Sequence, residues 1–331
     1  MEPILIAVVA IALIFDYTNG FHDAANAVAT SISTRAVPPN VALFAAAVLN
    51  LLGALVSTNV AATLAKGIVE PGAVTSPVML GGLFGAIVWN LLTWWWALPS
   101  SSSHCLIGGV AGAVLATTGA DAVKWNGLLE KVLIPTVLAP LIGFAVGITI
   151  MVAILWIFRR AHPQRAQRRF RLAQLLSASL MAFSHGSNDA QKTMGVITLA
   201  LFAGGAIPAL VVPFWVKLAS AVTIALGTYA GGKRIIRTLG MRLVKLTPAQ
   251  GFAAETAASA VLLGTAHFGF PISTTHVITT SVMGVGATER ASAVKWGLSV
   301  NIFIAWIVTL PASALIGGLC AVVAQAIFGG R

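Results

Sequence analysis

The sequence predicts an all-α polytopic membrane protein built from two inverted-topology repeats of about five membrane segments each. Three observations carry this prediction. The 331 residues are 58% hydrophobic and only 9% charged, whereas a soluble domain carries about 25% charged residues. Apolar runs long enough to cross a bilayer recur along the chain. Motifs of the first half also return, in the same order, in the second half.

Ten apolar segments divide the chain. We expect the first and sixth to be interrupted at glycine-containing polar motifs, and the last to be broken or strongly tilted because of its length. Short re-entrant pieces are expected near Pro99 and Pro271, so that broken or re-entrant helices lie at the midplane. The predicted segments are 4–33, 40–66, 76–98, 102–119, 131–158, 172–203, 208–231, 248–268, 273–288 and 296–327.

Four matched blocks define the repeat. They are 20–24 with 186–190, 99–104 with 271–276, 123–125 with 294–296, and Pro140 with Pro311. Five crossings per half is an odd number, so the second half begins on the opposite side of the membrane, as in many secondary transporters. The predicted organisation is a first repeat over 1–158, a cytoplasmic basic loop over 159–171 and a second repeat over 172–331.

The formal net charge of +11 is concentrated in two short stretches, 159–171 and 232–247. Basic loops beside apolar segments are typical of the cytoplasmic side. The sequence therefore predicts a multi-pass protein of the cell membrane with both termini outside. A nucleic-acid partner is not expected, because no basic face with interleaved aromatic residues is present. The two cysteines indicate neither a disulfide framework nor a metal site.

Two related motifs place carboxylates inside apolar segments. Asp23, Asn26 and Thr30 fall on one stripe of a helix, and Asp189 and Lys192 repeat part of that spacing. Ionisable groups at such positions indicate function. Carboxylate and amide oxygens predict a midplane site for sodium or a proton, with Lys192 compensating substrate charge or extending to the interface. The alternative is a polar cluster that ties helices together.

Two runs of hydroxyl residues each follow a proline and precede an apolar helix. The hydroxyl residues nearest the helix starts are Ser102, Ser103, Thr274 and Thr275. Free N–H groups and the helix dipole make such a start an anion site. Two starts converging from opposite repeats would hold a tetrahedral oxyanion, whereas ordinary capping is the alternative.

Further polar residues have more than one interpretation. His22 precedes Asp23 and is a candidate proton relay. His104 and His276 are candidates for metal binding or proton transfer, or for a structural hydrogen bond. Asp16 and Glu255 lack an acidic counterpart in the other half, and each is either a coupling carboxylate or an interface residue.

Together these motifs resemble those of the inorganic phosphate transporter (PiT) family. The resemblance rests on 20–27, 99–104, 185–190, 251–256 and 271–276, which span nearly the whole chain. It implies an inverted-repeat transporter that moves phosphate with sodium or protons. Bacterial members often take phosphate as a neutral complex with a divalent metal, and one branch moves sulfate.

The resemblance also implies roles for single residues. Asp23, Asn188 and Asp189 resemble the coupling-cation residues. Ser102, Ser103, Thr274 and Thr275 resemble the anion-binding residues, with Asn26 nearby. Many members have Asn where His22 stands, and a titratable imidazole favours proton coupling over sodium. The all-serine first hydroxyl motif differs from the mixed form and leaves phosphate and sulfate both open.

The predicted function is therefore a symporter for inorganic phosphate, alone or as a metal complex, driven by a proton or sodium gradient. A sulfate symporter is the alternative in the same family. A membrane-embedded hydrolase is disfavoured because the candidate nucleophiles come in two symmetric copies, and a channel would not concentrate its substrate. We expect no catalytic activity and no cofactor. The expected partners are an oxyanion and the lipid bilayer, with a homodimer left open.

Overall fold

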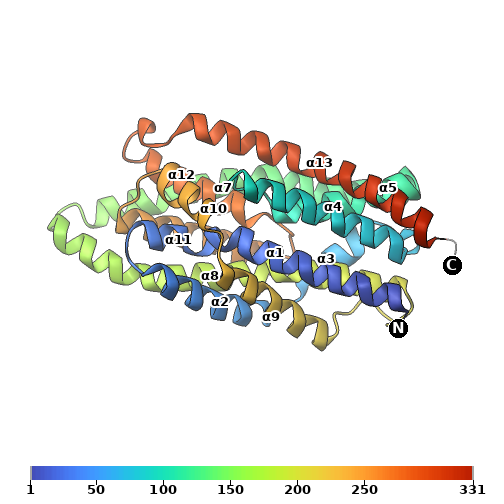
Figure 1. Ribbon diagram of the computed structural model, residues 1–331. Helices are drawn as coiled ribbons and strands as arrows, with labels where there is room; N and C mark the ends of the chain where they lie inside the picture. Colours follow the sequence, from blue (N-terminus) through green and yellow to red (C-terminus); the bar gives the residue numbers. More distant parts are fainter. Residues whose placement is uncertain (1, 330–331) are drawn as a thin grey trace.

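The computed structural model describes residues 2–329, and its long helices lie side by side along one axis of an elongated bundle (Figure 1). The helices are α1 (Pro3–Ser33), α2 (Pro39–Ala54), α3 (Asn59–Gly67), α4 (Ser76–Trp95), α5 (Ser102–Thr117), α6 (Trp125–Leu128), α7 (Ile134–Ile157), α8 (Pro163–Ala203), α9 (Phe214–Ala230), α10 (Lys233–Arg237), α11 (Pro248–His267), α12 (Thr274–Ala287) and α13 (Trp296–Phe328).

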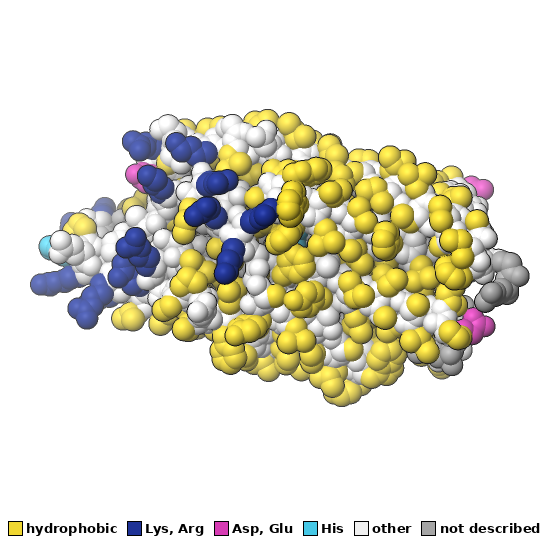
Figure 2. Space-filling model, in the orientation of Figure 1, with side chains coloured by type: hydrophobic (Ala, Val, Ile, Leu, Met, Phe, Trp, Pro, Cys, Tyr) yellow, Lys and Arg dark blue, Asp and Glu magenta, His cyan; other side chains and the backbone are white. Residues whose placement is uncertain are grey.

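The bundle is apolar outside, and its interior contains many polar side chains beside apolar ones, as expected for a protein solvated by lipid. By length and composition, α1, α4, the continuous run 125–157 and α13 can each cross a membrane, and α2 with α3, bent by 67°, can form a fifth span. Hydrophobic side chains cover the middle of the visible face (Figure 2). Many buried side chains, by contrast, are Asp, Asn, Ser, Thr or His. The prediction of an all-α polytopic membrane protein is confirmed.

Basic side chains gather at one end of the molecule. On the face shown in Figure 2, Lys and Arg lie at the end where α8 begins and near α10. Helix α1 begins and α13 ends at the opposite end of the bundle (Figure 1). The chain therefore has one basic end, and its first and last helices begin and end away from it.

Two short helices, α5 and α12, begin in the middle of the bundle and run toward opposite ends (Figure 1). Helix α5 packs against α4 and α13, and α12 packs against α11 and α7. Each re-entrant helix thus contacts the last helix of the other half. One main-chain hydrogen bond occurs at an equivalent place within each half. Lys124 N–H donates to Ile68 O (3.0 Å) in the first half, and Lys295 N–H donates to Leu243 O (3.1 Å) in the second.

The expected breaks in the first and sixth segments are wrong, because α1 and α8 run unbroken through their polar motifs. The glycines serve packing instead. A Cβ atom at Gly186 would lie 2.1 Å from the carbonyl oxygen of Asn50, and one at Gly20 would lie 2.5 Å from that of Ile224. Only glycine permits these close helix approaches. Helix α13 is also continuous, with Pro311 inside it.

The basic stretches are more helical than the sequence suggested. Most of the predicted loop 159–171 belongs to α8, which starts at Pro163. Proline suits the first turn of a helix, and the Gln, Arg, Ala and Leu residues that follow are good helix formers. The stretch 232–247 likewise contains α10 and a π-helical turn over Thr238–Arg242.

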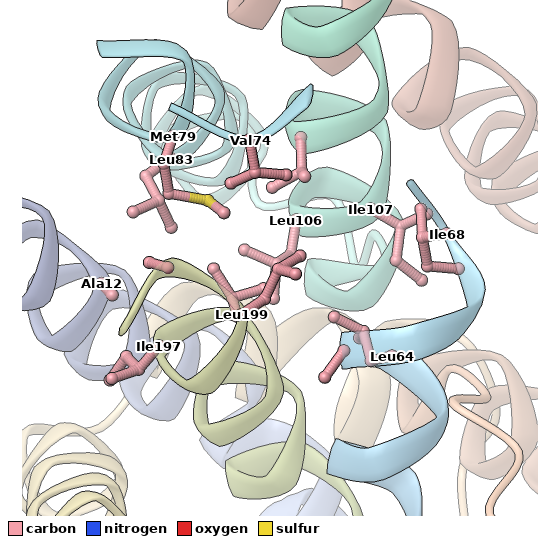
Figure 3. Packing of buried hydrophobic residues seen from close by; sticks show 14 of the residues in the cluster. Ala12, Leu64, Ile68, Val74, Met79, Leu83, Leu106, Ile107, Ile197 and Leu199 are labelled. Carbon is pink, nitrogen blue, oxygen red and sulfur yellow. The ribbon is translucent and has the colours of Figure 1, made fainter. Parts of the chain in front are cut away.

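A tight apolar cluster supports the start of α5. Figure 3 shows side chains of α1, α3, α4, α5 and α8 pointing toward one another, with Leu106 and Ile107 of α5 among them. Lipid is as apolar as these side chains, so close fit rather than exclusion of water stabilises such contacts. The fit is also close where α4 meets α13, since a Cβ atom at Gly85 would lie 2.4 Å from the nitrogen of Gly317. These helix contacts fix the direction in which α5 points.

Candidate functional site

The N-termini of α5 and α12 meet near the middle of the bundle. Each is capped by the serine before it: Ser101 Oγ accepts a hydrogen bond from His104 N–H (3.2 Å), and Ser273 Oγ accepts one from His276 N–H (3.3 Å). The rings of the two histidines lie edge to face, with centroids 5.0 Å apart. Two positive helix ends therefore point into one buried region.

The carboxylate of Asp23, on α1, lies against this junction. Ser102 Oγ donates to Asp23 Oδ2 (3.0 Å), and Thr275 Oγ1 donates to Asp23 Oδ1 (3.3 Å). His22 Nδ1 lies 2.7 Å from the same Oδ1 atom. Because Ser102 belongs to α5 and Thr275 to α12, one carboxylate holds both helix starts together.

Asp189, on α8, occupies the matching place from the other side. Thr274 Oγ1 donates to Asp189 Oδ2 (2.8 Å), and Lys192 forms an ion pair with Asp189 Oδ1. His185 Nε2 lies 3.1 Å from Asp189 Oδ2. One ligand atom from each of Asp23, His185 and Asp189 lies within 4.8 Å of the others, so carboxylate oxygens of both halves face one small volume.

The amide of Asn26 connects the first half to α12. Its Nδ2 donates to Thr275 Oγ1 (2.9 Å) and Thr274 Oγ1 (3.2 Å), while its Oδ1 has no hydrogen-bond partner among the described residues. In the second half, Lys192 Nζ donates to Ser103 Oγ. Contacts thus cross between the halves in both directions.

Nine of the ten predicted site residues belong to this connected network, and all nine are at most 4% exposed. They are His22, Asp23, Asn26, Ser102, Ser103, Asp189, Lys192, Thr274 and Thr275. Asn188 is different: it is fully buried, and neither of its amide atoms has a hydrogen-bond partner among the described residues. All ten side chains are therefore buried inside the bundle.

Several residues around the site have no role predicted from the sequence. Asn90, on α4, accepts a bond from Ser102 Oγ (3.2 Å), and Thr93 Oγ1 lies 3.2 Å from His22 Nε2. Asn50, on α2, lies 3.1 Å from His185 Nδ1 through its Oδ1 atom. In the sequence, Asn50 and Asn90 are isolated asparagines inside apolar helices. Such a residue indicates a buried hydrogen bond, but the sequence does not identify the residue that it bonds.

The two unmatched carboxylates lie outside this network. Thr193 Oγ1 donates to Asp16 Oδ1 (2.8 Å). Glu255 accepts bonds from Thr30 (2.5 Å), Gln174 (3.1 Å) and Ser177. Glu255 therefore joins α1, α8 and α11, which is the geometry of an interface residue.

The two histidines of the hydroxyl motifs have packing contacts. His104 Nε2 lies 2.8 Å from Thr136 Oγ1 on α7. The ring of His276 stacks on Trp306, with centroids 3.9 Å apart, and neither ring nitrogen has a hydrogen-bond partner in the described part of the chain. Trp306 in turn donates to the carbonyl oxygen of Pro99 (2.8 Å).

A cavity of about 790 Å³ opens at the basic end, where α1, α2, α4 and α10 come together. Its basic lining residues are Lys233, Arg234, Arg237 and Arg242. Such a lining raises the local concentration of anions. The cavity does not include any of the predicted site residues.

Comparison with known proteins points to one family. A model described as the phosphate transporter family matches residues 19–317. A probable low-affinity inorganic phosphate transporter of Rhizobium meliloti (strain 1021) is 48% identical over 320 residues, which cover 96% of each chain. A protein of Bacillus subtilis (strain 168) with the same description is 41% identical over 326 residues, covering 98% of each chain.

A solved structure has the same fold. It is described as the sodium-dependent phosphate transporter, with a TM-score of 0.88 and 25% sequence identity, and the match covers 99% of this chain and 100% of that one. The similarity therefore includes the whole helical arrangement around the two buried carboxylates.

Proposed function

The chain belongs to the phosphate transporter family, and on this premise we propose that it is a secondary active symporter that brings inorganic phosphate into the cell together with a cation. One observation carries the mechanism: the capped starts of α5 and α12 meet two buried carboxylates from opposite halves of the chain. The helix starts suit an anion, and the carboxylates suit a cation.

Binding of the anion and binding of the cation are coupled through shared hydrogen-bond donors. In this structure, Ser102 and Thr274 donate their hydroxyls to Asp23 and Asp189. An incoming oxyanion competes for these donors, and the carboxylates then lose partners while a second negative charge arrives. Buried unpaired charges are costly, so a cation or proton must bind at the carboxylates in the loaded state.

The proton is the coupling ion that we propose. His22 Nδ1 lies 2.7 Å from Asp23, and the imidazole is fully buried. Its Nε2 atom lies 3.2 Å from Thr93 Oγ1 and 3.3 Å from Ser100 Oγ, so hydroxyl groups continue the contact away from the carboxylate. Such a chain can pass a proton. Sodium is the alternative, and the solved structure is named for its dependence on that ion.

Phosphate suits this site better than sulfate. Near neutral pH phosphate still carries hydroxyl groups, which can donate hydrogen bonds to Asp23 and Asp189. Sulfate has only hydrogen-bond acceptors, so it has no hydrogen to donate to these carboxylates. A site that demands a donor strongly rejects an analogue that lacks one. A neutral metal–phosphate complex would meet the same carboxylates through its cation.

Alternating access follows from the arrangement of the halves. We assign 1–158 and 172–331 to the two repeats and 159–171 to their cytoplasmic connection. Each short helix packs on the last helix of the other repeat, so α4, α5 and α13 form one unit, and α11, α12 and α7 form another. Rocking of these two units about the central site would open it first to one side and then to the other.

Uptake by purified protein in proteoliposomes tests this function. With inward proton and sodium gradients together, labelled phosphate should accumulate above its equilibrium level, and excess unlabelled sulfate should not compete. Equilibration without accumulation would indicate a channel. The purified protein should not hydrolyse a phosphate ester, which separates the transporter from the hydrolase.

Loss of one hydroxyl at either helix start should weaken phosphate binding. Ser103→Ala and Thr275→Ala each remove a donor from the site of the anion. A hydrogen bond to a charged group contributes about 1.5–3 kcal/mol, or about ten- to a hundredfold in affinity. The apparent affinity for phosphate in the uptake assay should fall by this factor, whereas Thr149→Ala, at an exposed position with a bond only to its own helix, should leave it unchanged. Unchanged affinity in both site variants would contradict an anion site at the helix starts.

The basic end is proposed to face the cytoplasm of the cell membrane. Glu2 and Arg165 are both exposed and belong to opposite ends of the bundle. In a Cys320→Ala background, with Cys105 buried, Glu2→Cys should react with an impermeant thiol reagent in intact cells. Arg165→Cys should react only after permeabilisation. The reverse pattern would contradict the orientation inferred from the loop charges.

A further inference from the structure

Lys192 is the one lysine among the residues of the central site, which contains no arginine. It is 1% exposed. Its ammonium group donates to three oxygen atoms: a carboxylate oxygen of Asp189, the hydroxyl of Ser103 and the carbonyl of Ile272 (2.8 Å). An ammonium has three donors, and all three are used. No donor remains for direct binding of phosphate, which is the role that the sequence suggested.

These three acceptors form the set of ligands that a small hard cation takes. Carboxylate, hydroxyl and carbonyl oxygens from different segments suit such ions. They come here from α8, from the start of α5 and from Ile272, two residues before the start of α12. The ammonium therefore lies where a bound cation would lie.

The other half of the chain repeats the carboxylate and the hydroxyl of this set without the lysine. Asn26 and Lys192 lie 166 positions apart, the same separation as Asp23 and Asp189 (192 − 26 = 189 − 23). In the first half the neutral amide of Asn26 donates to Thr275, whose hydroxyl also contacts Asp23. The two halves thus repeat the carboxylate and hydroxyl contacts, and a neutral amide in the first half stands where the second half has a lysine.

This difference sets the charge of the empty site. Asp23 and Asp189 contribute two negative charges and Lys192 contributes one positive charge, which leaves one negative charge uncompensated. His22 and His185 are the titratable side chains that touch the two carboxylates, and a proton held by either counts as a mobile cation. One mobile cation is therefore enough to make the site neutral before phosphate enters.

We propose that Lys192 is a tethered cation that permanently fills the cation position of the second repeat, so that only the position at Asp23 takes up a mobile cation. This inference rests on the symport function proposed above. Each phosphate is then carried with one mobile cation fewer than in a carrier with both positions vacant. The alternative is a purely structural ion pair, which would not alter the number of coupled cations.

Lys192→Asn tests this assignment because it places in the second repeat the same residue type that the first repeat has at Asn26. In proteoliposomes, labelled phosphate uptake is measured against protons and against sodium separately. The Hill coefficient for the mobile cation should rise from about one in the wild type to about two in the variant. The cation gradient that just balances a fixed phosphate gradient, so that net phosphate flux is zero, should correspond to one more cation moved per phosphate in the variant.

Two further variants serve as controls. Asn26→Lys combined with Lys192→Asn moves the tethered charge to the other repeat and should restore the wild-type number of cations. Lys217→Asn removes a lysine of α9 outside the site and should change nothing. Unchanged cation number in Lys192→Asn, with phosphate still transported, would overturn the inference.

The wild type alone gives a test that does not depend on folding of any variant. A balance of cation and phosphate gradients at zero net flux that corresponds to one mobile cation per phosphate supports the tethered lysine, whereas two or more would overturn it. If the wild type accumulated phosphate under no gradient, that result would instead contradict the proposed symport function. The two failures are therefore distinguishable.

Discussion

Asp23→Asn is expected to abolish accumulation of phosphate while the protein still folds. The amide has nearly the shape of the carboxylate and can still accept the hydroxyl of Ser102 through its oxygen. It has no negative charge, so nothing attracts a cation or holds a transferable proton at this position. Labelled phosphate in proteoliposomes should then reach equilibrium at most, regardless of the gradient applied.

A matched control removes an exposed carboxylate of the same type. Asp121 lies on the surface, and Asp121→Asn should accumulate phosphate as the wild type does. Accumulation by Asp23→Asn comparable to that of Asp121→Asn would mean that the cation binds elsewhere. Asp16, which holds the hydroxyl of Thr193, would then be the next carboxylate to replace.

Asp189→Asn is expected to have the larger effect on stability. Asp189 is the ion-pair partner of Lys192, and both side chains are 1% exposed. Removal of one partner leaves a buried charge without compensation, which costs about 3–5 kcal/mol. The variant should show a clearly lower apparent melting temperature in detergent and reduced expression, in addition to loss of accumulation.

The combined variant Asp189→Asn with Lys192→Met separates stability from function. Methionine fills a similar volume without a charge, so the buried ammonium is no longer unpaired. Thermal stability should recover relative to Asp189→Asn alone, because neighbouring substitutions are not additive. The double variant should still fail to couple phosphate transport to the cation gradient. A double variant as unstable as the single one would contradict the importance of the ion pair.

Much of the architecture was predictable because the chain repeats its own motifs. Matched blocks at 99–104 and 271–276 predicted two equivalent helix starts, and both occur at the predicted places, with α5 beginning at Ser102 and α12 at Thr274. Odd numbers of crossings per repeat predicted that they would face each other. The meeting of the two histidine rings at 5.0 Å shows how close they come.

The glycines of the two Asp motifs could not be interpreted from sequence alone. Glycine inside a polar stretch fits a broken helix as well as a close helix contact. The outcome depends on which helix lies opposite, here α2 for Gly186 and α9 for Gly20. That information resides in tertiary packing, and the sequence pattern does not contain it.

The role of Lys192 was also beyond the sequence. Its spacing from Asp189 predicts a local contact on a helix, but the carbonyl of Ile272 belongs to a segment 80 positions later. Likewise, the amide of Asn26 meets Thr275 across 249 positions. Motif spacing identifies polar residues inside the membrane, whereas their pairing across the two repeats requires the fold.

Uptake in the absence of sodium tests whether phosphate symport is coupled to protons at the carboxylate pair. Wild-type protein is placed in sodium-free proteoliposomes with an alkaline interior, and uptake of labelled phosphate is followed before and after the proton gradient is collapsed. The account predicts accumulation above equilibrium that disappears with the gradient. Accumulation that appears only after sodium is added would contradict proton coupling and leave His22 with a packing role.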